Sequence, residues 1–415
     1  MLAAEDRRAA VAAKRLLPVS QRSVAQVAVT GSRAGTEQVL LDVTARLIRE
    51  EIPVTVIVPT GTALLERLAE EAAACGAAVA RVAPLYPGKR DHWGNLRQLV
   101  SIFHRLRPAV VHYHIPRAFS GFEAVMAGYL ARVPVRIRTD QNPIFWPPTR
   151  AQRLRLAIAD RMVDRIVLVS TDNRQNHVQF GRPERRCVMI PNGVDPTSVA
   201  CVMSPEARRR LRLRLNLPAH SPIAVMVGAN VRKGAVDYVK AAAVACALAP
   251  GLHHAIVGGG PLVAELQQMA RGLGIAERVH FLGQLVDLRQ VLPAFDLFVL
   301  PSHYEGLALT MLEALAAGLP MVATRVDGVS DVFPDARGAL LVDRYDTESL
   351  GAAIARLGSD AELRAQLSAI SQERVTSAFT TDATYQRYRA LYQDLGAFIP
   401  DSSRRSRRRS TSRDD

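Results

Sequence analysis

The chain has 415 residues, of which 48% are hydrophobic, and a formal net charge of +14. Its length exceeds one ordinary hydrophobic core and predicts two domains, and no apolar run reaches the roughly 18 residues of a membrane-spanning helix. The four cysteines lack C-x-x-C spacing, and residues 1–22 carry charges where a signal peptide has an apolar core. We therefore expect reduced thiols and a cytoplasmic location.

Both ends of the chain are basic. Residues 1–22 form an Ala-rich segment that is predicted to be helical over Leu2–Leu17, and residues 400–415 form an Arg-rich tail that is predicted to be disordered. Such ends are either solvated or bind an anionic surface, which would make the protein peripheral at the inner membrane face. The tail carries no nucleic-acid motif and no interleaved aromatic residues, so we expect no nucleic-acid partner.

From Val24 onwards, short β-branched runs alternate with amphipathic helices such as Glu37–Glu50 and Thr62–Ala74. Continuous apolar strands that alternate with helices indicate a parallel sheet covered on both faces. The strands expected in this first series are Val24–Val29, Val54–Val58, Val110–His112, Val135–Arg138, Arg165–Val169 and Val188–Ile190.

A second series follows a linker around Pro196 to Pro222. Its expected strands are Ile223–Val227, His254–Val257, Val279–Leu282, Leu297–Leu300, Met321–Thr324 and Ala339–Val342. The two series predict an α/β protein with two Rossmann-like, doubly wound domains over residues 23–200 and 201–378. Such domains bind ligands at the carboxyl ends of their strands, so a cleft between them is the expected active site.

Glu305 and Glu313 are separated by seven residues directly after one of these strands. Glu305 lies in a turn, and Glu313 lies in the helix that the turn opens. The first backbone N–H groups of that helix, at Leu307–Thr310, lie at the positive end of the helix dipole and predict a phosphate site. The two carboxylates would then face different parts of one phosphate-bearing ligand; the alternative is that both are solvated.

The segment Pro301–Phe333 resembles the E-x7-E signature of retaining GT-B glycosyltransferases of family 4, also called group 1. The likeness extends over most of the chain, roughly Val24 to Leu395. It implies an acceptor-side first domain, a nucleotide-sugar-binding second domain, and a helix over residues 379–399 that crosses back to the first domain. Further matches, in the family's order, are Ile190–Asp195, Lys233–Gly234, Val257–Pro261 and Val279–Gly283.

The resemblance implies roles for individual residues. Glu313 would bind the ribose hydroxyls, and Glu305 would lie beside the donor sugar at the reaction centre. The backbone that would meet sugar hydroxyls and phosphate is that of Gly306, Leu307, Ala308 and Leu309. Other donor-binding residues are expected at Gly258, Gly259 and Leu282.

Arg232 and Lys233 follow the first strand of the second domain. Fixed cations there would stabilise a departing diphosphate without a metal. The family usually separates its two basic positions, so adjacency leaves open that one of the pair points elsewhere. No D-x-D occurs in the chain, so we expect no metal and no cofactor besides the co-substrate, a UDP- or GDP-sugar.

The first domain departs from the family's pattern on the sugar and acceptor side. Gly35 matches the second glycine of the family's G-G-x-E turn. The residue before it is not glycine, so the close approach of the backbone to a ligand is lost there, and the Arg33 side chain could substitute for that contact. Gln141 stands where many relatives have a histidine. His112 begins a His-Tyr-His strand end, for which a structural or substrate-binding role is preferred to a metal. In the second domain Asp327–Asp331 replaces G-G-x-x-E.

The predicted function is retaining transfer of a sugar from a nucleotide-diphosphate donor to an unknown acceptor hydroxyl, lipid-linked or glycan. The setting would be glycolipid, polysaccharide or cell-envelope glycan synthesis. Three alternatives remain: a sugar-nucleotide epimerase of the same fold, a phosphorylase-type transferase, and a non-catalytic nucleotide-sugar-binding subunit.

Overall fold

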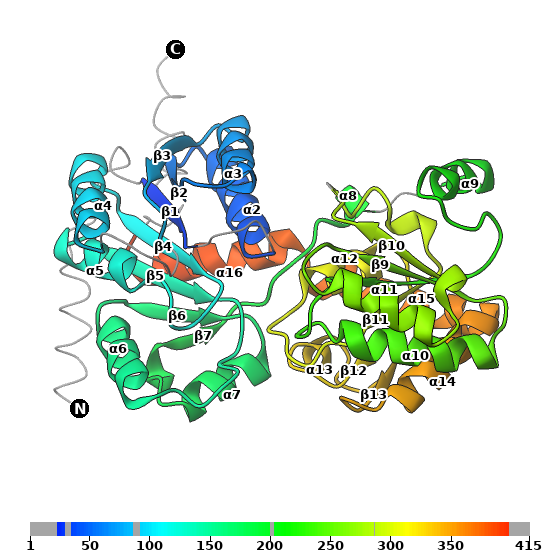
Figure 1. The fold of residues 1–415 in the computed structure, drawn as a ribbon. Coiled ribbons are helices and arrows are strands. Elements are labelled where there is room, and N and C mark those ends of the chain that lie inside the picture. The colour runs from blue at the N-terminus through cyan, green and yellow to red at the C-terminus, as the bar shows by residue number, and fades with distance from the viewer. Residues whose placement is uncertain (1–22, 30–34, 86–91, 200–202, 286, 398–415) are drawn as a thin grey trace, which may run out of the picture. The chain divides into compact units, whose positions relative to one another are not determined.

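The computed structural model describes residues 23–29, 35–85, 92–199, 203–285 and 287–397. The chain forms two compact units (Figure 1). The first unit contains the residues up to Val169, Arg174–Ile190 and those from Thr384 on, and the second contains Ser170–Asn173 and Pro191–Ala383. The basic segment 1–22, the tail 400–415 and Arg33, for which we made predictions above, lie outside the described residues.

The first unit is built on a parallel sheet of seven strands in the order β3-β2-β1-β4-β5-β6-β7. In the centre of the sheet, Val24 pairs with Val54 on one side and with Val110 on the other. The order reverses between β1 and β4, as in doubly wound folds. The strands are β1 (Val24–Ala28), β2 (Val54–Pro59), β3 (Ala78–Val82), β4 (Val110–Ile115), β5 (Val135–Asp140), β6 (Arg165–Leu168) and β7 (Cys187–Met189).

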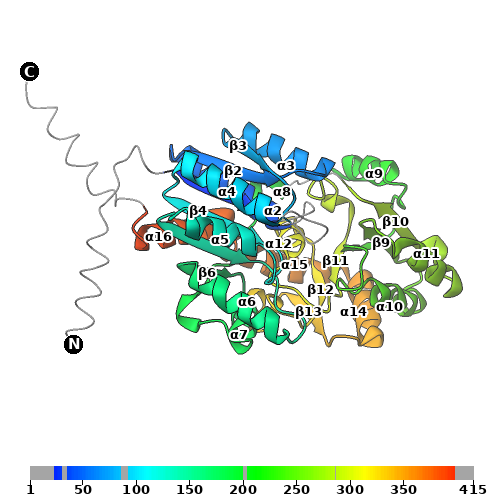
Figure 2. The same cartoon turned by 60° about the vertical axis from the view of Figure 1, so that its left-hand side comes forward.

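Helices follow these strands and cover the sheet. A capping box at the start of α6, in which Thr149 and Gln152 bond to each other's backbone, fixes the point where that helix begins. Figure 2 shows α4, α5 and α6 side by side over one part of the unit. The helices are α2 (Gly35–Arg49), α3 (Ala63–Ala74), α4 (His92–Leu106), α5 (Phe122–Leu130), α6 (Arg150–Arg161), α7 (Thr171–Gln179), the 3-10 helix η2 (Glu184–Arg186) and α16 (Thr381–Asp394).

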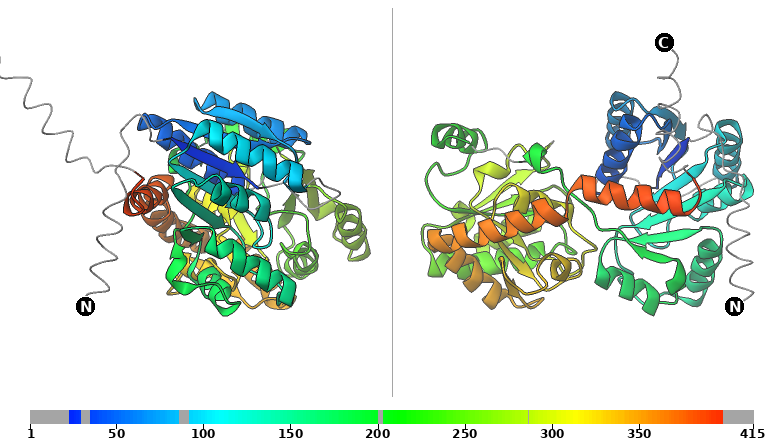
Figure 3. Two further views of the ribbon diagram at one scale, coloured as in Figure 1. Left: turned by 90° about the vertical axis from the view of Figure 1, so that its left-hand side faces the viewer. Right: turned by 180° about the vertical axis from the view of Figure 1, so that it is seen from behind.

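The last helix, α16, packs on the first sheet through its aromatic stripe (Figure 3). Tyr388 and Tyr392 are fully buried, and Arg389 pairs with Glu50 at 2.9 Å. Successive strand residues point to opposite faces of a sheet, so His112 meets α16 while Tyr113 packs in the core under α4 and α5. The tyrosines of α16 therefore serve packing.

The second unit holds a parallel sheet of six strands in the order β10-β9-β8-β11-β12-β13. The order reverses between β8 and β11, and this switch point is where an open α/β sheet binds ligands. The predicted class of two Rossmann-like parallel-sheet domains is therefore confirmed. The strands are β8 (Ile223–Val227), β9 (His253–Val257), β10 (Val279–Gly283), β11 (Leu297–Leu300), β12 (Met321–Thr324) and β13 (Ala339–Val342).

The helices of the second unit enclose a core of Ala, Val, Ile and Leu side chains. α10 and α14 pack closely because Gly351 has no side chain; a Cβ there would lie 2.6 Å from the Ala241 carbonyl oxygen. No helix among the described residues is long and apolar enough to cross a membrane. The helices are α8 (Pro196–Val199), α9 (Pro205–Arg214), α10 (Ala235–Leu248), α11 (Val263–Gly272), η3 (Ala276–Arg278), η4 (Leu292–Ala294), α12 (Leu309–Ala316), α13 (Val329–Val332), α14 (Thr347–Ser359) and α15 (Ala361–Ala378).

Candidate active site

Glu305 lies in the turn between β11 and α12, at the switch point of the second sheet. It is only 4% exposed. Two side chains hold the turn in place: on the neighbouring strand β12 the Thr324 hydroxyl donates to the Ser302 carbonyl oxygen at 2.6 Å, and in the segment before α8 the Asn192 side-chain amide donates to the Leu307 carbonyl oxygen at 3.2 Å. The position of this carboxylate is therefore set by the sheet rather than by a flexible loop.

Two cations and a hydroxyl meet the Glu305 carboxylate. Lys233 Nζ lies 2.7 Å from Oε1, Arg232 Nη1 lies 3.2 Å from Oε2, and the Ser302 hydroxyl donates to Oε1 at 2.8 Å. Burial by itself raises the pKa of Glu305, but Lys233 and Arg232 outweigh it and hold the pKa below its ordinary value. Glu305 is therefore a carboxylate at neutral pH, and both basic residues point towards it despite their adjacency.

The loop between β8 and α10 brings the two cations to this turn. Gly234 begins α10 with φ of +68°, and a Cβ there would lie 1.8 Å from the Pro301 carbonyl oxygen. Only glycine fits this close approach. The His303 amide donates to the Arg232 carbonyl oxygen at 2.9 Å, and the Lys233 amide donates to the Asn230 side chain at 3.1 Å. The two strand-end loops thus form one rigid substructure.

The charges of this cluster do not cancel, because two cations surround one carboxylate. The Lys233 side chain is 14% exposed and the Arg232 side chain 36% exposed, so both can meet a ligand without unfolding the loop. Arg presents a planar fork to phosphate and Lys a compact charge. The arrangement can therefore bind a multiply charged anion and stabilise negative charge that develops on it.

The start of α12 lies next to this cluster. Its cap residue, Ala308, offers no side-chain bond to the first turn, and the Thr310 hydroxyl is buried without a hydrogen-bond partner among the described residues. The predicted anion site at this helix start is thus compatible with the geometry. Glu313 lies half-buried one turn further along α12, Leu309 is buried at its first position, and Gly306, Leu307 and Ala308 are buried in the preceding turn.

The glycines after β9 pack against the same loop system. Gly258 has φ of +129°, and a Cβ there would lie 2.9 Å from the Ala229 amide nitrogen, in the loop that carries Lys233. Gly259 follows with open space around it. Leu282 is half-buried near the carboxyl end of β10. The donor residues predicted from the sequence therefore lie at the carboxyl ends of β8, β9, β10 and β11.

The turn after β12 completes this edge of the sheet. A Cβ at Gly328 would lie 2.3 Å from the Gly306 carbonyl oxygen, so the turn packs on the one that carries Glu305. Burial, together with Asp172 and Asp331, raises the pKa of Asp327 to about 6 although Arg344 opposes the shift. The departure from G-G-x-x-E therefore places an easily protonated carboxyl near the candidate site.

The sequence reasoning missed some partners of this cluster. No role was predicted for Ser302, but its hydroxyl bonds directly to Glu305. His303 Nε2 lies 2.6 Å from the Asp237 carboxylate on α10, and the Arg344 guanidinium donates to the His303 carbonyl oxygen. The Pro301-Ser302 pair, which directly follows β11, could itself have indicated Ser302. The partners of His303 are far away in the chain and had no local signal in the sequence.

In the first unit the three predicted sugar-side residues that the structure describes, Gly35, His112 and Gln141, do not form a comparable cluster. Gly35 is exposed at the start of α2, and Gln141 is buried just after β5, where its backbone amide donates to the Ile115 carbonyl oxygen. His112 is fully buried, with Nδ1 2.8 Å from the Tyr392 hydroxyl and Nε2 2.7 Å from the Thr139 hydroxyl. Burial lowers its pKa well below the ordinary range. Because both ring nitrogens already contact buried hydroxyls, the contacts of His112 favour a structural role over substrate binding.

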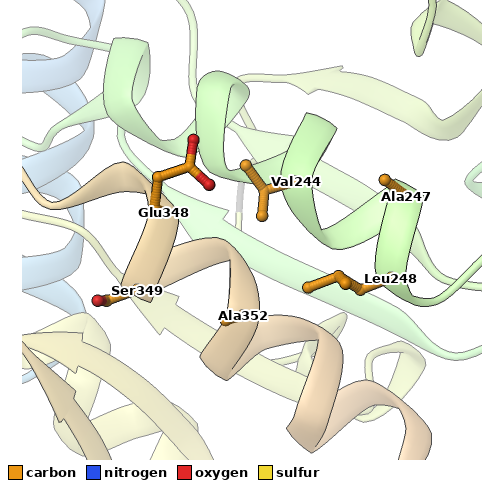
Figure 4. A pocket seen from close by; sticks show the side chains of 6 residues that line it. All are labelled: Val244, Ala247, Leu248, Glu348, Ser349 and Ala352. Carbon is orange, nitrogen blue, oxygen red and sulfur yellow. The ribbon is translucent and has the colours of Figure 1, made fainter.

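Two other features bear on possible sites. A groove of about 550 Å³ between α10 and α14 is lined by Val244, Ala247, Leu248, Glu348, Ser349 and Ala352 (Figure 4). Its only charge is a carboxylate, so it does not suit a diphosphate. Among the described residues, no group of three or more His, Cys, Asp or Glu side chains is placed to hold a metal ion.

Comparison with known proteins places the chain in a family. Residues 33–198 match the family described as Glycosyltransferase Family 4, and residues 207–374 match Glycosyl transferases group 1. A GDP-mannose-dependent alpha-(1-6)-phosphatidylinositol monomannoside mannosyltransferase of Mycolicibacterium smegmatis is 30% identical over 62% of this chain and 70% of its own length. The chain belongs to the group 1 / family 4 glycosyltransferases.

Further relatives agree with this assignment. The lipopolysaccharide core biosynthesis glycosyltransferase LpsE of Rhizobium meliloti is 33% identical, and the match covers 43% of this chain and 52% of LpsE. The crystal structure of Anabaena HepE in complex with UDP superposes on this chain with a TM-score of 0.76 at 19% sequence identity. The superposition covers 90% of this chain and all of HepE. The structural likeness supports the GT-B fold.

Proposed function

We propose that this family 4 chain transfers a sugar from a nucleoside-diphosphate donor to an acceptor hydroxyl, with retention of configuration and without a metal. The observation that carries the proposal is the buried Glu305 carboxylate with Lys233 and Arg232 at the switch point of the second sheet. The crystal structures of Anabaena HepE with UDP and with UDP-glucose support a nucleotide-sugar donor.

The donor would occupy the carboxyl edge of the second sheet. Its diphosphate would lie between the start of α12 and the two cations, and its ribose would lie at Glu313. Gly258 and Gly259 leave room for the nucleotide at the end of β9. Glu305 would remain beside the sugar and keep Lys233 and Arg232 in position for the phosphate oxygens.

The reaction would proceed by front-face attack through an oxocarbenium-like state. The bond between the anomeric carbon and the diphosphate oxygen breaks, and the bond between that carbon and the acceptor oxygen forms on the same face. The acceptor proton passes to an oxygen of the departing diphosphate. Lys233 and Arg232 stabilise the charge that develops there. The products are the glycosylated acceptor and the protonated nucleoside diphosphate.

We further propose a lipid-linked glycan as the acceptor and a peripheral location at the inner face of the membrane. The named relatives support this: one acts in lipopolysaccharide core biosynthesis and another on phosphatidylinositol monomannoside.

Thermal-shift measurements with a panel of UDP- and GDP-sugars test the proposal. A donor that binds the folded state raises Tm with concentration, and the donor that fits should give the largest shift. Release of nucleoside diphosphate should then require an acceptor. Release or interconversion of the donor sugar without acceptor would indicate an epimerase, and turnover that needs inorganic phosphate would indicate a phosphorylase.

A further inference from the structure

Large apolar side chains are exposed around the starts of α4 and α6. Trp93 in the first turn of α4 is 70% exposed, Trp146 in the segment before α6 is 73% exposed, and Leu154 on α6 is 64% exposed. Exposed aromatic and aliphatic groups that gather in one region mark interaction sites. The surface-exposed tryptophans therefore indicate a partner.

Contacts to Glu123, at the start of α5, bring these helix ends together. His92 Nδ1 and Arg155 Nη2 lie 2.9 Å and 3.0 Å from the same Glu123 oxygen. His92 precedes Trp93 and Arg155 follows Leu154 in the chain. Figures 1 and 2 both show α4, α5 and α6 as neighbours. The exposed groups of α4 and α6 thus belong to one surface of the first unit.

The exposed charged residues of α4 and α6 are basic, and Glu123 on α5 is only 15% exposed and is paired with His92 and Arg155. The only acidic residue of α6, Asp160, is buried and bonded to Arg182. Leu154 and Ile158 are four residues apart and lie on one exposed face of the helix. On α4, Arg97 is exposed one turn after Trp93. The exposed charged residues of α6 are Arg150, Arg153, Arg155 and Arg161.

We propose that this surface binds an anionic lipid bilayer. We call it the rim patch. Tryptophan prefers the membrane–water interface, aliphatic groups insert at the acyl boundary, and arginine is attracted to anionic head groups. The combination of exposed apolar groups with arginine, and with no exposed acid on α6, matches a negatively charged lipid surface. The rim patch consists of Trp93, Arg97, Trp146, Arg150, Arg153 and Leu154.

The place of the rim patch connects it to the proposed reaction. α4, α5 and α6 follow β3, β4 and β5, so their first turns lie towards the carboxyl edge of the first sheet, where such folds bind ligands. Docking would hold this edge next to the lipid, within reach of a lipid-linked acceptor. This last step rests on the proposed function, whereas lipid binding by the rim patch does not.

Co-sedimentation of the full chain with vesicles tests the proposal. The wild type should sediment with phosphatidylcholine vesicles that contain phosphatidylglycerol and remain in solution with pure phosphatidylcholine. The triple variant Trp93→Ser/Trp146→Ser/Leu154→Ser should lose about tenfold or more in partitioning, because each removed group loses its apolar contact with the lipid. Its Tm should equal that of the wild type, since all three side chains are exposed.

A second set of variants tests the arginines of the rim patch, whose attraction to anionic head groups is independent of the apolar contacts. Arg150→Gln and Arg153→Gln should each weaken partitioning about fivefold. Added salt should weaken binding of the wild type and narrow its difference from these variants. Loss of binding by the apolar variant together with unchanged binding by both arginine variants would contradict the proposal of an anionic lipid.

Two controls distinguish lipid binding by the rim patch from lipid binding by the rest of the chain. Leu130→Ser, at the opposite end of α5 with 51% exposure, should bind vesicles like the wild type. A chain that ends at Ala397 should keep the partitioning that depends on the rim patch. The proposal is overturned if the wild type binds no anionic vesicles or if removal of the tail alone abolishes binding. It is also overturned if the triple variant binds normally but dissociates a wild-type oligomer, because the patch would then be a protein interface.

Discussion

Each unit contains a cluster of Arg, Lys, Asp or Glu side chains at the carboxyl end of a strand, on β5 in the first unit and just after β11 in the second, but the two clusters differ in exposure. In the first unit, Arg138 lies 2.9 Å from both oxygens of Asp140, Arg182 bonds to Asp140 and to Asp160, and all four residues are buried. In the second unit, Glu305 is buried, but its partners Lys233 and Arg232 are partly exposed.

The difference indicates which cluster can act on a ligand. Two arginines and two aspartates in the first unit neutralise one another, and His177 beside them is uncharged because burial lowers its pKa to about 3. The second unit has an excess cation next to a helix start, at the switch point of its sheet. We infer that the first cluster stabilises the fold and the second binds the donor.

The largest expected effect is on the stability of the first unit. Asp140→Ala leaves Arg138 and Arg182 without a shared carboxylate in the interior, and removing one partner of a buried charge network costs about 3–5 kcal/mol. The free energy of unfolding from urea titration should fall by that amount. As a control, Glu184→Ala removes an exposed partner of Arg174 and should cost about 1 kcal/mol or less. Equal effects of the two variants would contradict a structural role for the buried cluster.

The next effect is on catalysis in the second unit. Glu305→Gln keeps the shape of the side chain but removes the charge that holds Lys233 and Arg232, so kcat should fall about 100- to 1,000-fold. Turnover is measured with the donor and acceptor that the screen identifies, and Glu348→Gln in the α10–α14 groove serves as the control. Unchanged turnover would favour the non-catalytic nucleotide-sugar-binding alternative.

A smaller effect is expected where α16 meets the first sheet. Tyr392→Phe removes the hydroxyl next to His112 Nδ1 and leaves a buried polar atom unsatisfied, which costs about 1–3 kcal/mol. Urea titration should show this loss. Tyr345→Phe, on an exposed tyrosine, should change stability by about 0.5 kcal/mol or less. If Tyr392→Phe is equally silent, the hydrogen bond between Tyr392 and His112 does not help to hold the helix on the sheet.

The smallest expected effect depends on pH. The pKa of Asp327 is raised to about 6, so the wild type is most stable while this carboxyl is protonated and loses stability as pH rises through about 6. The free energy of unfolding of Asp327→Asn should therefore exceed that of the wild type by about 1 kcal/mol at pH 8, after allowance for solvent screening. The two should converge at about pH 4, near the ordinary pKa of Asp. Asp343→Asn, on an exposed residue, should show no such pH dependence.

The sequence predicted most of the strands because most contain a short run of apolar, β-branched residues. Leu297–Leu300 and Ile223–Val227 have the predicted bounds, since a strand buried on both faces leaves little choice of residue. β3 was missed: its Ala-Val-Ala-Arg-Val sequence is largely exposed at the sheet edge and lacks this signal. The chain also enters the second unit after Ile190, before the boundary that we set at residue 200.

The candidate site was predictable only in part. The E-x7-E spacing and Lys233-Gly234 are local patterns, and the residues of the Glu305 cluster that we propose to bind the donor could be named from them. The network around Asp140 was not predictable, because Arg182 is 42 residues away in the chain and joins it only through folding. For the same reason the burial of His112 under Tyr392, 280 residues later, had no signal in the His-Tyr-His pattern.

Nucleotide binding by the full chain tests the central claim most directly. Calorimetric titration with UDP and with GDP should detect binding of one of them to the wild type, and Lys233→Ala should weaken that binding about 10- to 100-fold, as expected for loss of one or two charge-assisted hydrogen bonds to phosphate. Because Lys233→Ala leaves the buried Glu305 with Arg232 and Ser302 as its remaining partners, the variant should unfold at a lower temperature than the wild type, and a melting curve should show that it is still folded at the temperature of the titration. If neither nucleotide binds the wild type, or if Lys233→Ala binds as tightly, the cluster at Glu305 is not the donor site.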